Sequence, residues 1–222
     1  MGRFSFLGLF SLILVLNFNL SKLLTPTNGG QLVCVDKIVK SLSFSFDSQI
    51  ADLLWLNFLQ EIDAYNEGKI ADQYLCLDGS FSWHFHVLDI AIDLDNKFYE
   101  LMAVGPLVVS ITINDSKGAT LLFDKAVKNF PNDWRILYQA SYQAQFEEGN
   151  LKKAADLLYR AALNGAPRWT YSLAGGLYSQ VGMKQASESI YFLLKEKFPD
   201  DEVTKRLKSK LENKVKNFFE KK

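Results

Sequence analysis

A pattern of small and apolar residues that ends in proline recurs three times in the second half of the chain. Residues 119–131 read ATLLFDKAVKNFP, residues 154–167 read AADLLYRAALNGAP, and residues 186–199 read ASESIYFLLKEKFP. Each copy starts with Ala, has an aromatic or apolar residue four positions later, and has a small or apolar residue seven positions later. Recurrence at this spacing predicts a helical repeat, in which the small residue lets two helices approach closely and the next apolar residue fills the adjoining layer.

The spacing resembles the tetratricopeptide repeat (TPR), a helix–turn–helix unit of about 34 residues. Gly149-Asn150-Leu151 resembles the turn between the two helices of that family, and Ala174, one turn before Tyr178, resembles its small-residue crossing. The resemblance covers residues 96–199 and is extended to residues 50–95, where the Ala pattern is lost. It implies an all-α fold, a short α-solenoid of TPR-like antiparallel helix pairs whose concave groove binds a protein segment.

The helical period starts near residue 47 and continues to the last proline of the pattern. Asp47 or Ser48 is expected to cap the first helix, and Ser80 the second. Gly105-Pro106 falls inside a later helix, where proline favours a kink, but the repeat pattern still favours a helix. We therefore predict a TPR-like domain over residues 47–199.

The N-terminal segment has the composition of an export signal. Residues 4–24 are largely apolar, a length of about 20 residues that can cross a bilayer as a helix, and Arg3 precedes them. No small-x-small cleavage site follows, so we predict a signal anchor over residues 1–24; a cleaved signal peptide and a buried helix of a soluble protein are the alternatives. Residues 25–46, which begin Thr-Pro-Thr-Asn-Gly-Gly-Gln, are expected to form a linker.

This layout resembles membrane-anchored TPR proteins of bacteria. The positive charge of Arg3 and of the free amine favours a cytoplasmic N-terminus and an exported body. We therefore expect the body on the periplasmic side of the bacterial inner membrane, or secreted if the signal is cleaved.

Composition argues against several classes of function. The 222 residues are 48% hydrophobic and 23% charged, which indicates a globular protein, and 25 bases balance 25 acids, which argues against nucleic acid. His84 and His86 would point about 200° apart on a helix, one exposed and one half-buried, so they cannot bind one metal ion together. We expect no metal, no cofactor, no small-molecule substrate and no catalytic residue. Whether Cys34 and Cys76 pair is left open.

Charge is unevenly distributed along the chain. Residues 47–100 hold eleven acids and two bases, a net −9, whereas residues 202–222 hold eight bases and three acids, a net +5. This uneven distribution is explained either by charged faces that keep the helices soluble or by a charge difference between an acidic front and a basic end of the helical array. The apolar stripe of residues 200–222 predicts a capping helix over the last pair; a basic amphipathic helix on anionic lipid is the alternative.

The resemblance also implies a binding groove, formed mainly by the first helix of each pair. Aligning the third pair on Leu137 and Ala154, and the fourth on Leu173 and Ala186, directs seven side chains into it: Arg135, Tyr138, Tyr142, Gln145, Arg168, Tyr171 and Tyr178. Tyrosine and arginine are enriched in protein interfaces, and two arginines favour a partner segment with carboxylates. Alternatively, these tyrosines are packing residues.

We therefore expect a non-catalytic, membrane-anchored scaffold for protein–protein interaction. A structural assembly factor, or an accessory subunit of an envelope complex that acts through flat oligomeric contacts, is the alternative. An enzyme is the least favoured reading.

Overall fold

The computed structural model describes residues 37–66 and 81–220, and every regular element within them is a helix, as predicted for an all-α protein. The chain forms two compact units, residues 1–101 (unit 1) and residues 102–222 (unit 2). No helix in these described ranges has both the length and the hydropathy needed to cross a bilayer. The predicted signal anchor at residues 1–24 lies outside them.

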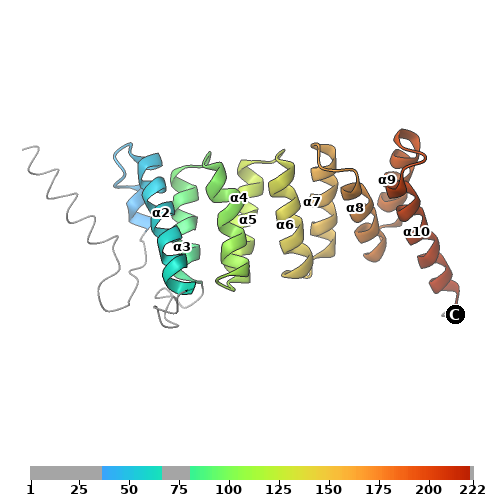
Figure 1. Cartoon of the computed structure of the whole chain (residues 1–222), viewed down its shortest axis with the longest axis horizontal. Coiled ribbons are helices and arrows are strands. Elements are labelled where there is room, and N and C mark those ends of the chain that lie inside the picture. Colours follow the sequence, from blue (N-terminus) through green and yellow to red (C-terminus); the bar gives the residue numbers. More distant parts are fainter. Residues whose placement is uncertain (1–36, 67–80, 221–222) are drawn as a thin grey trace, which may run out of the picture. The chain divides into compact units, whose positions relative to one another are not determined.

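Unit 1 contains a short 3-10 helix, η1 (Lys37–Lys40), and two α-helices, α2 (Asp47–Asn66) and α3 (Trp83–Leu94) (Figure 1). Helix α2 packs against α3 and buries Leu54 and Phe58 almost completely. The predicted cap at Ser80 was wrong. The cap is Ser82, whose Oγ accepts a hydrogen bond from the backbone N–H of Phe85 at 3.1 Å. The helix that starts after Ser82 buries Phe85, Leu88 and Ile92.

The next helix, α4 (Tyr99–Ile111), continues through Pro106, so the helical prediction for this stretch is confirmed. Unit 2 then contains six further helices in the described residues. They are α5 (Ser116–Asn129), α6 (Trp134–Phe146), α7 (Leu151–Leu163), α8 (Trp169–Gln180), α9 (Lys184–Lys197) and α10 (Glu202–Glu220). From α5 to α9 each helix packs on the next, and α10 packs on both α8 and α9, as Figure 1 shows.

The same turn precedes α5, α7 and α9. In each, a residue with positive φ stands directly before the N-cap of the following helix, a conformation that favours Gly or Asn. The φ angles are 61°, 66° and 84° at Asn114, Gly149 and Gly182, and the caps are Asp115, Asn150 and Met183. The same turn therefore recurs three times, between α4 and α5, between α6 and α7, and between α8 and α9.

A second corner also recurs, after α5 and after α9. Phe130-Pro131-Asn132-Asp133 precedes α6, and Phe198-Pro199-Asp200-Asp201 precedes α10. Asp133 Oδ1 accepts hydrogen bonds from the N–H groups of Arg135 and Ile136 at 2.9 and 3.0 Å, and Asp201 Oδ1 accepts one from the N–H of Val203 at 3.0 Å. Helix α10 thus begins in the same way as α6.

The predicted Ala positions lie at close helix crossings in α5 and α7. Ala119, Ala126, Ala154 and Ala161 are all 0% exposed. In α9 the prediction was wrong by one residue, because Ala186 is only half-buried while Ser187 is 0% exposed. The N-cap gives the reason: Ser187 is the fourth residue after Met183, just as Ala154 is the fourth after Asn150.

Helix α8 is packed tightly from two sides at Gly175. The hydroxyl of Ser187 in α9 donates a hydrogen bond to the Gly175 carbonyl at 2.6 Å. A Cβ at Gly175 would lie 2.9 Å from both methyl carbons of the fully buried Leu207 in α10. Gly175 is therefore a close-packing residue.

Candidate functional site

The first and second helices of the pairs differ sharply in charge. Helices α6 and α8 carry a single charged residue between them, Arg135. Helices α5, α7 and α9 carry thirteen. Charged side chains keep an exposed helix face solvated. The outward sides of α6 and α8 lack such side chains, so their exposed surface is formed by other residue types.

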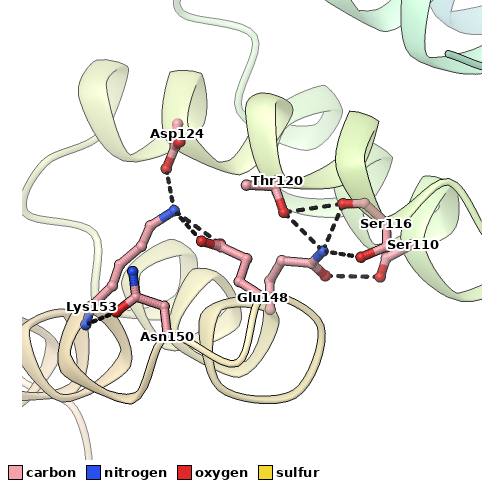
Figure 2. A network of polar contacts seen from close by, with 8 residues as sticks. Ser110, Ser116, Thr120, Asp124, Glu148, Asn150 and Lys153 are labelled. Atoms are coloured by element: carbon pink, nitrogen blue, oxygen red, sulfur yellow. Dashed lines mark hydrogen bonds and ion pairs between the residues drawn. The ribbon is translucent and has the colours of Figure 1, made fainter. Parts of the chain in front are cut away.

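A polar network fixes the packed side of α6 (Figure 2). Gln143 is 2% exposed, and its Oε1 accepts a hydrogen bond from the Ser110 hydroxyl of α4 at 2.8 Å. Its Nε2 donates to the Ser116 carbonyl at 3.0 Å and to the Thr120 hydroxyl at 3.2 Å, both in α5. Because this amide is buried and bonded on both of its ends, it sets the rotation of α6 about its own axis.

A second cluster in Figure 2 connects α5, the α6–α7 turn and α7. The Lys153 ammonium lies 2.8 Å from Asp124 Oδ1 and 2.9 Å from Glu148 Oε1. Partial burial acts to lower the pKa of Lys153, but hydrogen bonds and attraction from Asp124 and Glu148 outweigh it and raise this pKa above its ordinary value. The cluster therefore holds the charged form of Lys153 and joins three segments of unit 2.

With the packed side of α6 fixed, its outward side is aromatic. Tyr138, Tyr142 and Phe146 follow one another at four-residue spacing, and the rings of Tyr142 and Phe146 lie 4.5 Å apart. The Tyr138 ring meets the Trp169 ring of α8 edge-on at 5.4 Å, and Leu173 follows Trp169 one turn later. We call these five residues, Tyr138, Tyr142, Phe146, Trp169 and Leu173, the aromatic face.

The aromatic face is open to solvent. Tyr142 is 50% exposed, Phe146 59%, Trp169 41% and Leu173 38%. Of the sequence-predicted residues, Tyr138 and Tyr142 belong to this face. Gln145 lies half-buried on the same helix.

The two predicted arginines have different surroundings. Arg135 is exposed at the start of α6, with its Cζ 4.9 Å from the centre of the Trp134 ring, and it forms no ion pair with a described residue. Arg168 pairs with Asp201 Oδ2 at 3.0 Å and lies over the Phe198 ring at 4.2 Å. Arg168 therefore ties the start of α8 to the corner that precedes α10.

The two predicted tyrosines of α8 face α7 instead. Tyr178 is 7% exposed, and its hydroxyl donates a hydrogen bond to Asp156 Oδ1 at 2.7 Å. Burial and this bond raise the pKa of Tyr178 well above its ordinary value. Tyr171 is half-buried, its ring 6.2 Å from that of Tyr159, and burial raises its pKa too. These are contacts within the fold, and they leave little of Tyr178 for a partner.

Trp169, Leu173 and Phe146 were missed by the sequence alignment. Their signal was present in the sequence, because α6 and α8 are almost free of charge. Phe146 follows Tyr138 and Tyr142 at four-residue spacing in α6, and Leu173 follows Trp169 at the same spacing in α8. Aligning the fourth pair on Leu173 and Ala186, of which Leu173 is 38% exposed and Ala186 only half-buried, selected Tyr171 and Tyr178 instead.

The expectation of one exposed histidine was wrong. His84 is 0% exposed and His86 is half-buried, because α3 is buried on nearly all sides between Trp83 and Ile92. Across residues 37–66 and 81–220, no three His, Cys, Asp or Glu side chains are grouped so that they could hold a metal ion. No protein-family model and no curated protein matches the chain.

Proposed function

We propose that this protein is a non-catalytic scaffold for protein–protein interaction, built from TPR-like helical pairs. Residues 1–24 anchor it in a membrane, with the body exported to the periplasmic side of the bacterial inner membrane. The aromatic face of α6 and α8 binds a segment of a partner protein.

The observation that carries the proposal is the exposed, uncharged aromatic face. Four large apolar side chains lie 38–59% exposed on two adjacent helices that have only Arg135 as a charge. Contiguous apolar surface of this kind on a soluble domain marks interaction sites, and aromatic residues contribute most to protein binding.

The neighbourhood of the face also indicates the chemistry of the partner. Arg135 is exposed and unpaired among the described residues, so its guanidinium is available to a carboxylate. Arg168 is already paired with Asp201. We therefore expect a partner segment with apolar side chains and at least one acidic residue, which meets Arg135 and not Arg168.

Site-specific photo-crosslinking in native membranes tests the proposal. A photoreactive residue is placed at Tyr142 or Leu173 on the aromatic face, and at Phe192 on α9 as the control, because Phe192 is 61% exposed on a charged second helix. The same crosslinked protein should form from both face positions and not from Phe192. Arg135→Glu should reduce that product without changing the melting temperature.

Two outcomes would contradict the proposal. Equal crosslinking from all three positions would mean that the face has no preferred partner. A product made of two copies of this chain would instead indicate self-assembly through the face, as expected of a structural assembly factor.

A further inference from the structure

Unit 1 exposes a concentrated apolar segment before α2. Ile38 and Leu42 are each 56% exposed, Phe44 is 78% exposed and Phe46 is 61% exposed. These four side chains lie within nine residues, and we call residues 38–46 the apolar turn. Among residues 38–62 and 81–212, only four other large apolar side chains exceed 55% exposure: Ile111, Phe146, Leu163 and Phe192.

The apolar turn has a defined conformation that presents its phenylalanines to solvent. Phe44 and Ser45 have φ angles of 47° and 72°, a region that L residues other than Asn and Asp rarely adopt. The N–H of Phe46 donates a hydrogen bond to the Ser43 carbonyl at 2.8 Å and closes the turn. Ser43 itself is only 7% exposed.

The turn is also attached to the rest of unit 1. The Ser43 hydroxyl donates a hydrogen bond to the Lys40 carbonyl at 3.1 Å. The Lys40 ammonium pairs with Asp93 Oδ2 of α3 at 3.2 Å. Phe44 and Phe46 therefore project from a turn that is closed and held against α3.

The position of the turn in the chain indicates what covers it. The predicted anchor ends at Leu24, and thirteen residue steps separate Leu24 from Lys37. Fully extended, such a segment spans at most about 45 Å, so the turn stays close to the bilayer surface if the anchor spans the membrane. Phe and Leu side chains on an amphipathic surface enter the boundary between headgroups and acyl chains.

Charge selects the kind of lipid. Residues 47–100 carry a net −9, so an anionic surface would repel unit 1. Lys40, the base within the turn, is already paired with Asp93. We infer that the apolar turn inserts Phe44 and Phe46 into the interfacial layer of a zwitterionic bilayer, as a second membrane contact beside the anchor; the inference rests on the proposed anchor for its position.

The test uses the full chain reconstituted in phosphatidylcholine vesicles, with Cys34→Ser and Cys76→Ser. An environment-sensitive fluorophore is attached at Leu42→Cys, or at Phe192→Cys in α9 as the control of similar exposure. Lipids with a nitroxide at the headgroup boundary should quench the fluorophore at position 42 at least twofold more than that at position 192. If Leu42→Cys lowers the melting temperature, Phe46→Cys serves as the label site, with Phe44→Gly alone as the test variant.

A double variant separates insertion from mere proximity to the anchor. Phe44→Gly with Phe46→Ser, in the Leu42-labelled protein, should reduce quenching to the level of position 192. Glycine adopts the φ of 47° without strain, so this variant should keep its fold, which the melting temperature verifies. Quenching that survives the double variant, or that is equal at positions 42 and 192, would overturn the inference.

Two further measurements assign the outcome. Carbonate extraction of the same vesicles tests the anchor separately. If the chain resists extraction while the fluorophore at position 42 stays unquenched, the anchor is supported and insertion of the apolar turn is refuted. Adding phosphatidylglycerol should weaken quenching at position 42 because unit 1 is acidic. An increase would show that attraction to anionic lipid, and not insertion of apolar side chains, brings position 42 to the bilayer, and it would overturn the inference.

Discussion

Helix α7 buries Ala154 and Ala161 completely and carries four charged residues, whereas α8 carries no charge and exposes Trp169 and Leu173. Both helices have a tightly packed inner side, formed in α8 around Gly175. They differ on the outer side, where α7 is solvated by lysine, arginine and aspartate and α8 presents aromatic and aliphatic surface. The difference separates residues that hold unit 2 together from residues that are free to bind a partner, and point substitutions can test this separation.

The largest expected effect compares two leucines of α8. Leu177 is 5% exposed and Leu173 is 38% exposed, one turn apart. Leu177→Ala should lower the free energy of unfolding by about 2–5 kcal/mol because it leaves a cavity. Leu173→Ala should cost less than about 1 kcal/mol, because the side chain is already partly in water. Urea unfolding measures both, and equal costs would mean that Leu173 belongs to the core.

Overpacking of a helix crossing should have the next largest effect. Ala154 is 0% exposed, so Ala154→Leu should destabilise unit 2 by about 1–3 kcal/mol. Lys152→Leu places the same side chain on the exposed side of α7, where only the 2.7 Å ion pair with Asp156 is lost. That control should stay within about 0.5 kcal/mol of the original protein. No difference between the two variants would show that the Ala positions do not mark a close crossing.

Two Tyr→Phe substitutions, each of which removes one hydroxyl group, test the distinction between residues that hold unit 2 together and residues on its outer side. The Tyr178 hydroxyl is bonded to Asp156 Oδ1 at 2.7 Å, so Tyr178→Phe should cost about 1 kcal/mol. Tyr142→Phe removes the same atom from a side chain that is 50% exposed and should change the unfolding free energy by less than about 0.5 kcal/mol. Equal effects would place Tyr178 and Tyr142 in the same kind of environment.

The smallest effect concerns the acid range. Hydrogen bonding from the Val203 N–H and from Arg168 lowers the pKa of Asp201 below its ordinary value of 3.8. The unfolded chain therefore binds this proton more readily, so the stabilisation is present above pH 3.8 and is lost as the pH falls through the lowered value. In Asp201→Asn the melting temperature should fall less steeply with acid. If the melting temperature of Asp201→Asn fell with acid as steeply as that of the original protein, the Arg168–Asp201 pair would not contribute to holding α8 and α10 together.

The sequence predicted the all-α class, and it predicted the buried Ala positions wherever the repeat pattern was strict. Ala119, Ala126, Ala154 and Ala161 are small in the sequence and buried in the structure because close helix crossings leave no room for larger side chains. In α9 two small residues, Ala186 and Ser187, are adjacent, and the pattern predicted Ala186 as the residue at the close crossing. The Ser187 hydroxyl resolves the choice, since its bond to the Gly175 carbonyl makes a polar residue suitable in a buried crossing.

The candidate site was only half accessible to sequence reasoning. Tyr138 and Tyr142 were placed on the outward side of α6 by aligning the pair on Leu137 and Ala154, and both of these residues are indeed 0% exposed. The N-cap Asp133, whose side chain accepts two backbone hydrogen bonds, marks the start of the same helix. Helix α8 has no such marker: its N-cap, Arg168, makes no side-chain cap hydrogen bond. Two residues of error rotate a helix by about 200°, which exchanges the side that carries Trp169 for the side that carries Tyr171.

The strain at Phe44 could not be predicted at all. The sequence assigns this stretch only to a linker, whereas the structure shows a tight turn with two consecutive left-handed residues. Phenylalanine has no intrinsic preference for that conformation, so only its surroundings, among them the buried Ser43 and the paired Lys40, determine it.

The corner that recurs before α6 and α10 divides unit 2 into segments that begin and end with the same local structure. Phe130 and Phe198 end their helices with similar backbone angles, (−122°, 64°) and (−144°, 62°), and each leads through proline to an aspartate that starts the next helix. Residues 134–201 thus form a 68-residue cassette that leaves through the same kind of corner by which it is entered. A tandem duplication that joins Asp201 to a second Trp134 would meet matching geometry at the new junction, so unit 2 could gain or lose hairpins in whole steps.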